Sequence, residues 1–175
     1  MIRKATINDF DEVFPLLMMA SQCVYESVLG TTDSHKIKSY VKKLYNDSYT
    51  KISYKNIIVY DKFGKIAGCV AYFDSKLEKE YNIKMESFLH NNNKFGLEGI
   101  LNTNYIDSIA VYPKYQGQKI SKKLIEYINN ESKLNVSLIA ENTKTKVIEY
   151  YKRLGFKPIG EIKLYDIDFT EMILK

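Results

Sequence analysis

The residues with the most chemical potential lie in one segment, Ile109 to Ser121, which reads IAVYPKYQGQKIS. An apolar, strand-like run ends at Pro113, and a polar turn containing Gly117 then leads into a helix. A junction of this kind directs several backbone N–H groups and the positive end of a helix dipole at one spot. The segment therefore indicates an anion site suited to a pyrophosphate. Junctions of a strand, a loop and a helix are common, so the pattern alone does not identify the ligand.

A second motif stands near the C-terminal end, where Tyr151 to Phe156 reads YKRLGF. Together the two motifs resemble the GNAT superfamily of acyl-CoA-dependent N-acyltransferases. That family carries a strand, often with Ala-Val before x-Pro, and a Gln/Arg-x-x-Gly-x-Gly/Ala turn that opens a helix. A later helix ends in Tyr-x-x-Leu-Gly-Phe. Gln116 matches the first position of the turn, and YKRLGF matches the later motif in full. The resemblance extends from about residue 1 to the end of the chain, and residues 74–104 are the part it does not explain.

Two positions of the turn depart from the family pattern. Lys119 stands where the first family glycine would be, and Ser121 replaces the Gly/Ala, whereas Gly117 is kept where many members also have glycine. A glycine lets the backbone approach phosphates closely and adopt a positive φ. Lys119 is therefore expected either to narrow the turn or to place an ammonium beside the pyrophosphate. Ser121 is small and can donate a hydrogen bond, so we expect it to be tolerated.

The resemblance implies that acetyl-CoA is the co-substrate, and it assigns cofactor contacts along the chain. The backbone of residues 109–111 would pair with the pantetheine arm as an added strand does, and the turn would hold the pyrophosphate. Many members also have an Asn seven positions before the tyrosine. Position 144 is a lysine here, and Asn142 is the alternative. The predicted cofactor-binding residues are Ile109, Ala110, Val111, Gln116, Gly117, Gln118, Lys119, Ile120, Ser121, Lys122, Asn142 and Lys144.

The resemblance also implies a general acid. Tyr151 would lie near the sulfur and protonate the leaving thiolate, a role that suits a phenol because its O–H is a donor at neutral pH. The alternative is a half-buried aromatic side chain that packs on an amphipathic helix. Its neighbour Tyr150 faces another way on the helix and is expected to serve packing.

The general base has two candidates. The attacking amine must lose a proton, directly or through water. Asp107 lies on the predicted strand and shares a face with Tyr105 and Ile109 by alternation, and Glu141 ends the next strand. Either carboxylate is placed to reach a cleft where the two strands part, and the sequence leaves the choice open. Direct transfer in a ternary complex needs no covalent enzyme intermediate, so Cys69 is not required as a nucleophile.

The elements that must position these residues alternate between strands and helices. We predict strands over 2–5, 56–60, 65–73, 105–111 and 136–140, and a closing hairpin over 157–175 that turns at Tyr165-Asp166. We predict helices from a cap at Thr6 or Asn8, around 37–44, over 121–129, and over 145–154 with a stop at Gly155. Residues 74–104 are either an insertion or a helical lid. The predicted apolar helix faces are Phe10, Val13, Phe14, Leu17 and Met18; Ile37, Val41 and Leu44; and Leu124, Ile125 and Ile128.

This order of elements predicts an α/β fold in a single domain spanning residues 1–175, and the resemblance implies that it is an N-acetyltransferase domain. The sheet should be mixed and mostly antiparallel, flanked by helices, with a central parallel strand pair joined across the helix over 121–129.

Composition excludes several classes of protein. The chain has 175 residues, of which 45% are hydrophobic and 27% charged, so it is long and apolar enough for a sizeable core and is not disordered. No apolar stretch reaches the length of a membrane span, and no signal peptide is evident, so we expect a cytoplasmic protein.

Cys23 and Cys69 are expected to be buried free thiols, and no spacing suggests a metal site. The net charge is +5, but the lysines are scattered and only two arginines occur, which disfavours nucleic acid as a partner.

The sequence therefore predicts an N-acetyltransferase that moves an acetyl group from acetyl-CoA to a primary amine of a small molecule or protein by direct transfer. The alternative is a non-catalytic acyl-CoA-binding or regulatory domain on the same fold. Tyr25, Tyr40, Tyr45 and Glu26 are candidates for an amine pocket, although ordinary packing explains them as well. The final hairpin is a candidate surface for a homodimer.

Overall fold

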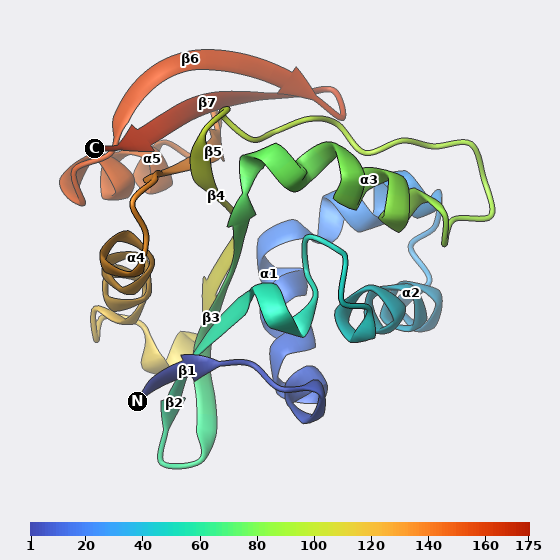
Figure 1. The fold of residues 1–175 in the computed structure, drawn as a ribbon, viewed down its shortest axis with the longest axis horizontal. Coiled ribbons are helices and arrows are strands. Elements are labelled where there is room, and N and C mark those ends of the chain that lie inside the picture. Colours follow the sequence, from blue (N-terminus) through green and yellow to red (C-terminus); the bar gives the residue numbers. More distant parts are fainter.

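A seven-stranded sheet with helices on both faces is the frame of the molecule (Figure 1). The computed structural model describes residues 1–175. The strand order is β1-β2-β3-β4-β5-β7-β6, and all neighbours are antiparallel except β4 and β5, which are parallel. The predicted mixed sheet with one central parallel pair is thereby confirmed.

The elements follow the predicted order, with ends that differ by up to three residues. The strands are β1 (Ile2–Lys4), β2 (Ile57–Lys62), β3 (Lys65–Asp74), β4 (Thr103–Val111), β5 (Asn135–Glu141), β6 (Lys157–Leu164) and β7 (Ile167–Leu174). The helices are α1 (Phe10–Leu29), α2 (Ser34–Asn46), α3 (Glu78–Glu86), α4 (Ile120–Glu131) and α5 (Thr145–Arg153). Short 3-10 turns are η1 (Ile7–Asp9), η2 (Tyr54–Asn56), η3 (Ser75–Leu77) and η4 (Pro113–Tyr115).

The first helical segment begins at Thr6, one of the two predicted caps. The Thr6 amide donates to the Asp9 carboxylate at 2.7 Å, and Arg3 reaches the same carboxylate at 2.7 Å. This capping box fixes the chain between β1 and α1. Further along α1, Ser21 departs from helical geometry with φ −139° and ψ 22°, which kinks the helix. The helix ends at Gly30, which takes the left-handed φ of 63° that a glycine adopts at low cost.

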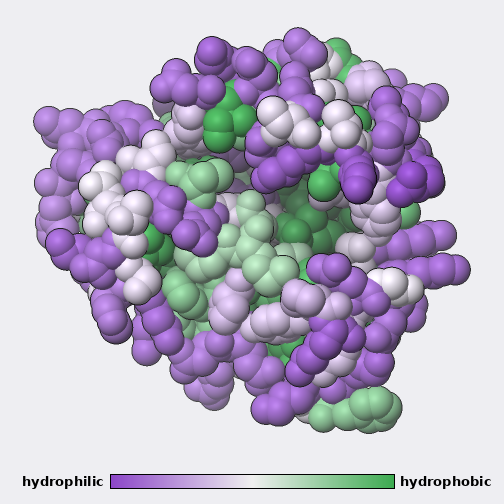
Figure 2. All heavy atoms as spheres, turned by 180° about the vertical axis from the view of Figure 1, so that it is seen from behind, coloured by the Kyte–Doolittle hydropathy of each residue, from purple (hydrophilic) through white to green (hydrophobic).

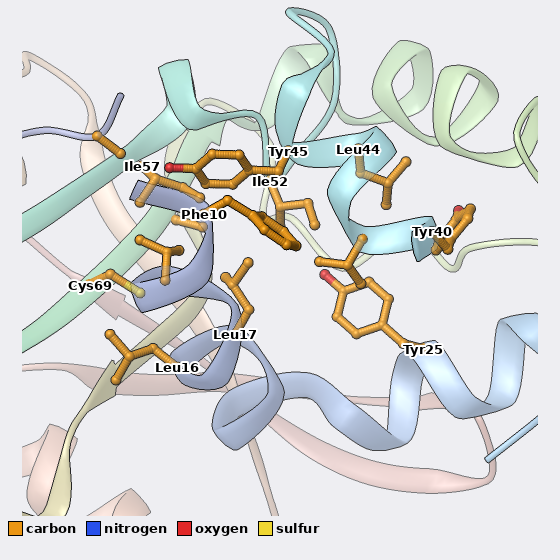
Figure 3. Packing of buried hydrophobic residues seen from close by; sticks show 14 of the residues in the cluster. Phe10, Leu16, Leu17, Tyr25, Tyr40, Leu44, Tyr45, Ile52, Ile57 and Cys69 are labelled. Atoms are coloured by element: carbon orange, nitrogen blue, oxygen red, sulfur yellow. The ribbon is translucent and has the colours of Figure 1, made fainter. Parts of the chain in front are cut away.

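Two apolar cores lie on the two faces of the sheet. The core under α1 and α2 includes Phe10, Leu17, Leu44 and Tyr45, whose side chains converge in Figure 3. The core under α4 and α5 is built on Leu124, Ile125, Ile128 and Phe156. The predicted apolar faces are confirmed: Phe10, Val13, Leu17, Ile37, Val41, Leu44, Leu124, Ile125 and Ile128 are buried, and Phe14 and Met18 pack against the first core.

The two cysteines differ in exposure. Cys69 is buried in the first core, as predicted. Cys23 is exposed, so the prediction that it is buried was wrong. The apolar run around it belongs to an amphipathic helix, and Cys23 lines a cavity between α1 and the sheet instead of packing into the core.

A β-bulge interrupts β4 at Asp107. Ala71 of β3 pairs with Ser108 and Tyr72 pairs with Ile106, which leaves Asp107 as the extra residue. The bulge changes the side-chain alternation along β4. Ile109 consequently packs toward the α4 core, so the prediction that it shares a face with Asp107 and the buried Tyr105 was wrong.

The region between β3 and β4 contains α3 and then an irregular stretch, residues 87–102, which we call the covering segment. The sequence left the structure of this region open. Lys51, in the loop after α2, and Glu78, on α3, form an ion pair of 2.8 Å beneath it, and their side chains are only 1% and 4% exposed. The Glu78 carboxylate also accepts the amides of Glu98 at 2.9 Å and Gly99 at 2.8 Å. The buried pair thus attaches the covering segment to α3.

No single helix is long and apolar enough to span a membrane; only residues 7–29 and 34–46 taken together, bent by 102°, have the necessary length and composition. No group of three or more His, Cys, Asp or Glu side chains is arranged to hold a metal ion.

Removal of the buried cation tests how far the ion pair supports the fold. Lys51→Met replaces the aliphatic part of the lysine side chain but removes its ammonium, so the Glu78 carboxylate stays buried without a cation. We expect the free energy of unfolding to fall by about 3–5 kcal/mol, the usual cost of breaking a buried pair, as measured by urea denaturation. The matched control is Lys55→Met, at an exposed lysine, which should change stability by less than about 0.5 kcal/mol. Equal denaturation midpoints for the two variants would contradict the structural role of the pair.

Candidate active site

The site is built where β4 and β5 part. Only Thr103–Tyr105 of β4 pair with Asn135–Ser137 of β5. Beyond these residues each strand continues with its outer neighbour alone, β4 with β3 and β5 with β7. A cleft opens between the ends of the two strands, and the predicted cleft between Asp107 and Glu141 is in this region.

The larger of two cavities in this region has a volume of about 710 Å³. It lies beside the end of β4 and the starts of α4 and α5, and 10 of its 16 lining residues are hydrophobic. The rear face of the molecule has a hollow with an apolar floor and a hydrophilic rim (Figure 2). The lining residues are Met19, Ile109, Ala110, Val111, Tyr115, Gln116, Gly117, Lys119, Ile120, Ser121, Lys122, Val147, Tyr150, Tyr151, Arg153 and Leu154.

The turn before α4 has the backbone geometry of an anion site. Gly117 and Lys119 both adopt left-handed conformations, with φ of 78° and 59°. The first hydrogen bond of α4 runs from the Lys123 amide to the Lys119 carbonyl at 3.0 Å. The amides of residues 120–122 therefore precede the helical hydrogen bonds and remain available at the positive end of the helix. Arg153 adds a cationic side chain to the lining of the same cavity.

Nine of the twelve predicted cofactor-binding residues line this cavity: Ile109, Ala110, Val111, Gln116, Gly117, Lys119, Ile120, Ser121 and Lys122. The other three side chains are engaged elsewhere. Gln118 accepts a hydrogen bond from Lys62 at 2.6 Å, and Asn142 accepts one from Thr170 at 2.7 Å. Lys144 pairs with Glu141 at 2.8 Å and lines the second cavity. The seventh position before Tyr151 thus does not contribute to the large cavity through its side chain.

The smaller cavity, of about 400 Å³, lies between α1 and the diverging ends of β4 and β5. Four residues line both cavities, namely Met19, Ile109, Val147 and Tyr151. The two cavities therefore meet at the Tyr151 ring. Sequence reasoning missed Val147 and Leu154, although their spacing from Tyr151 on α5 places all three on one helix face. No local signal identifies Met19, because its position depends on the path of α1.

Tyr151 packs edge-on against Phe156 at a ring separation of 5.6 Å, and its hydroxyl donates no hydrogen bond within the protein. Burial, with a smaller effect of Tyr150, raises the pKa of Tyr151 to about 12. The phenol therefore stays protonated at neutral pH. The prediction that Tyr150 faces another way on the helix was wrong. Tyr150 lines the large cavity, and its hydroxyl shares a hydrogen bond of 2.6 Å with the Ser121 hydroxyl.

Two carboxylates line the small cavity from its inner side, Asp107 of β4 and Glu98 of the covering segment. Burial raises the pKa of Asp107, although Lys51 opposes the effect. Burial likewise raises the pKa of Glu98 to about 6, against the opposing effects of Lys51 and of the hydrogen bond from Tyr105. No sequence pattern pointed to Glu98, because it stands in an irregular segment.

Glu141, the other predicted base, also lines the small cavity, but it is paired there with Lys144 at 2.8 Å. Hydrogen bonds from Lys144 and from Thr143 hold the pKa of Glu141 below its usual value. Its carboxylate is thus stabilised in the ionised form, which makes it a weak proton acceptor.

Of the four candidate amine-pocket residues, one lies beside the small cavity and three form hydrogen bonds elsewhere in the protein. Tyr25 lies beside the small cavity, in a compartment that it shares with Asp107 and Glu98. The other candidates have structural partners: Tyr40 donates to the Met85 carbonyl at 2.9 Å, Tyr45 donates to the Thr6 carbonyl at 2.7 Å, and Glu26 accepts from Gln22 at 2.7 Å.

The family model of the acetyltransferase (GNAT) domain matches residues 53–158. The chain therefore belongs to the GNAT acetyltransferase family, a family that uses acetyl-CoA. This confirms the resemblance that the two motifs indicated. No curated protein sequence matches the chain.

Solved structures share the fold over nearly the whole chain. The N-acetyltransferase from Staphylococcus aureus Mu50 is 22% identical, with a TM-score of 0.87 over 99% of this chain and 100% of that one. The ribosomal-protein-S18-alanine N-acetyltransferase from Escherichia coli is 16% identical, with a TM-score of 0.60 over 99% of this chain and 92% of that one. The NatB acetyltransferase complex bound to CoA and MES is 13% identical, with a TM-score of 0.61 over 99% and 97%. At these identities the likeness shows the fold alone.

Proposed function

We propose that the protein is an N-acetyltransferase that transfers an acetyl group from acetyl-CoA to a primary amine by direct attack. The observation that carries this proposal is the meeting of two unlike cavities at one phenol. One cavity ends in an anion-binding turn, and the other holds carboxylates with raised pKa values. A cytoplasmic location and a homodimer remain predictions from the sequence.

The large cavity fits acetyl-CoA in shape and charge. Its volume is within the range of about 300–1,000 Å³ that is usual for small-molecule sites. The backbone of residues 109–111 faces the cleft without a strand on that side, so it can pair with the pantetheine arm. The amides of residues 120–122, together with Lys119 and Arg153, suit the pyrophosphate. The thioester then reaches the junction of the two cavities.

The protonation states of the side chains at the junction of the two cavities determine which of them can accept a proton and which can donate one. The amine nitrogen attacks the thioester carbonyl carbon, so a C–N bond forms and the C–S bond breaks. We assign Asp107 as the group that takes the proton of the amine, because its raised pKa makes it a better acceptor than Glu141. Tyr151 donates its proton to the departing sulfur. Both steps need the amine and the thioester together, and no covalent enzyme intermediate is involved.

A second candidate function is an acyl-CoA-binding domain without turnover. It is favoured by Lys119, a non-glycine residue held in a left-handed conformation at the turn. Such a residue makes the turn less adaptable than glycine would. Replacement of Tyr151 distinguishes the two functions, because it should lower turnover in an enzyme, whereas a binding domain has no turnover to lose.

Replacement of Gly117 tests the cofactor site. Gly117→Ala meets no neighbouring atom within 4 Å, but it forces alanine into a φ of 78°. We expect the turn to relax and the affinity for acetyl-CoA to fall about 5- to 20-fold in calorimetric titration, from a strain of about 1–2 kcal/mol. Gly30→Ala is the matched control, since Gly30 also has positive φ and open space but lies far along α1. It should lose similar thermal stability and keep its affinity; equal affinity losses in both variants would argue against a cofactor role for the turn.

Replacement of Tyr151 separates catalysis from binding. Tyr151→Phe removes the proton donor but keeps the packing against Phe156, so we expect kcat to fall about 10²- to 10³-fold with little change in the Kd of acetyl-CoA. Tyr127→Phe, at a half-buried tyrosine against the same core, is the control and should keep its activity. Undiminished turnover by Tyr151→Phe would refute its role as general acid.

The carboxylate pair predicts the pH dependence of the reaction. Below its pKa a protonated carboxyl cannot take the proton of the amine, so kcat/KM should fall as pH drops. Burial raises the pKa of Asp107, so we expect the acidic limb at a higher pH than that at which an ordinary aspartate titrates. Asp107→Asn should lower kcat/KM about 10²- to 10⁴-fold and abolish this limb, whereas Asp166→Asn, in the exposed hairpin turn, should preserve both. A limb that persists in the Asp107 variant would point to a different base.

A further inference from the structure

The covering segment spans one end of the small cavity. At its start, the side-chain amides of Asn91 and Asn93 donate to the Val28 carbonyl at 2.9 and 3.0 Å, which attaches it to the last turn of α1. Further along, the Gly96 amide donates to the Tyr165 hydroxyl at 2.9 Å, which attaches it to the turn between β6 and β7. Figure 1 shows this stretch of chain crossing from α3 toward the β6–β7 hairpin. It therefore bridges the two elements that flank the cavity at this end.

Glu98 is held firmly within this segment. Its amide and that of Gly99 are bound by the Glu78 carboxylate, which in turn is paired with buried Lys51. Its side chain accepts a hydrogen bond from the Tyr105 hydroxyl at 3.0 Å. Gly99 permits this close approach, since a Cβ there would lie 2.9 Å from the Glu78 carboxylate. Both the backbone and the side chain of Glu98 are thus fixed toward the small cavity.

Negative charge exceeds positive charge at the inner end of the small cavity. Lys51 lines a compartment of about 20 Å³ there together with Glu98 and Asp107, but its ammonium is paired with Glu78, and neither Glu98 nor Asp107 has a cation within ion-pair distance. Tyr25 is only 2% exposed, yet its hydroxyl has no hydrogen-bond partner and faces the same compartment. Two carboxylates and a free hydroxyl around one space suit an ammonium group, which offers three donors and a positive charge.

The rest of the small cavity is mostly apolar, and its other polar lining residues are Ser21, Ser108 and the paired Glu141 and Lys144. Of its 20 lining residues 14 are hydrophobic, and its volume of about 400 Å³ is at the low end for small-molecule sites. Because the covering segment closes the end at Glu98, a polypeptide could extend past Glu98 only by displacing this segment.

We propose that the acceptor is a compact primary amine with a small apolar body rather than a polypeptide, and that Glu98 determines this specificity by binding the ammonium beside Asp107. This inference rests on the proposed N-acetyltransferase function. The bound ammonium passes one proton to Asp107, and the neutral amine then attacks the thioester carbonyl carbon. As the C–S bond breaks, Tyr151 gives its proton to the sulfur, and the nitrogen passes its second proton to the Tyr151 oxygen.

The first test compares acceptors on the full-length protein. Phenethylamine and hexylamine are measured against a six-residue peptide with a free N-terminus and an internal lysine, with release of CoA and acetylated product both followed. We expect kcat/KM for a small amine to exceed that for the peptide at least tenfold. Preference for the peptide would overturn this inference but support the N-acetyltransferase function. No acetylation of any probe, with acetyl-CoA bound, would overturn both.

The second test replaces Glu98. Glu98→Gln keeps the shape of the side chain but removes its charge, so we expect KM for the small amine to rise at least tenfold, with a smaller change in kcat. The Kd of acetyl-CoA and the thermal midpoint report whether the variant is intact. Glu131→Gln, at an exposed carboxylate on α4, is the matched control and should behave as the parent protein. An unchanged KM in the Glu98 variant would overturn its role in specificity.

The third test loosens the covering segment without touching the carboxylates. Asn91→Ala combined with Asn93→Ala removes the attachment to α1, and we expect peptide acetylation to rise at least fivefold. Asn92→Ala, between them and exposed, is the control and should leave the acceptor preference as it was. If the double variant retained its full preference for the small amine over the peptide, the covering segment would not be what excludes polypeptides.

Discussion

The limited pairing between β4 and β5 is the constraint on which the site depends. Three residue pairs join the two strands. Beyond them, β4 pairs only with β3, and β5 pairs only with β7. Each half of the sheet therefore keeps its own hydrogen bonds while the cleft stays open between them. The apolar cores under α1 and under α4 support the two halves from opposite faces. A fully paired sheet would leave no space for either cavity at this position.

Backbone irregularities at the rim of the cleft determine what faces it. The bulge at Asp107 brings an extra residue into β4, so that a carboxylate and Ser108 stand beside α1 while Ile109 turns toward α4. Ser108 donates to the Asp107 carboxylate at 2.8 Å and shares a hydrogen bond of 2.9 Å with Ser21, at the kink of α1. The irregular points of strand and helix thus meet and stabilise each other. Bulges are often found next to active sites for this reason, since they redirect a side chain without breaking the sheet.

Features with a local pattern could be predicted from the sequence, and features that depend on distant contacts could not. Helical spacing and turn residues predicted the strands and the buried helix faces, because each signal lies within a few residues. The family resemblance of the two motifs predicted most of the lining of the large cavity. The orientation of Ile109 depends on register with β3, and that of Asn142 depends on Thr170 in β7. Glu98 follows no periodicity, and its position depends on contacts with α3 and β4. The candidate base was open between two carboxylates until their neighbours were known.

The buried Lys51–Glu78 pair connects the stability of the fold to the chemistry of the small cavity. A buried ion pair is an uncertain source of stability, since apolar side chains of similar volume often serve as well or better. Apolar side chains at these two positions would not accept the amides of Glu98 and Gly99, and they would not place a cation behind two carboxylates. Lys51 lowers the pKa values of both Asp107 and Glu98 against the effect of burial, which keeps the pair able to ionise near neutral pH. The main effect of this pair is therefore less on the packing of the core than on the charge of the two carboxylates that line the small cavity.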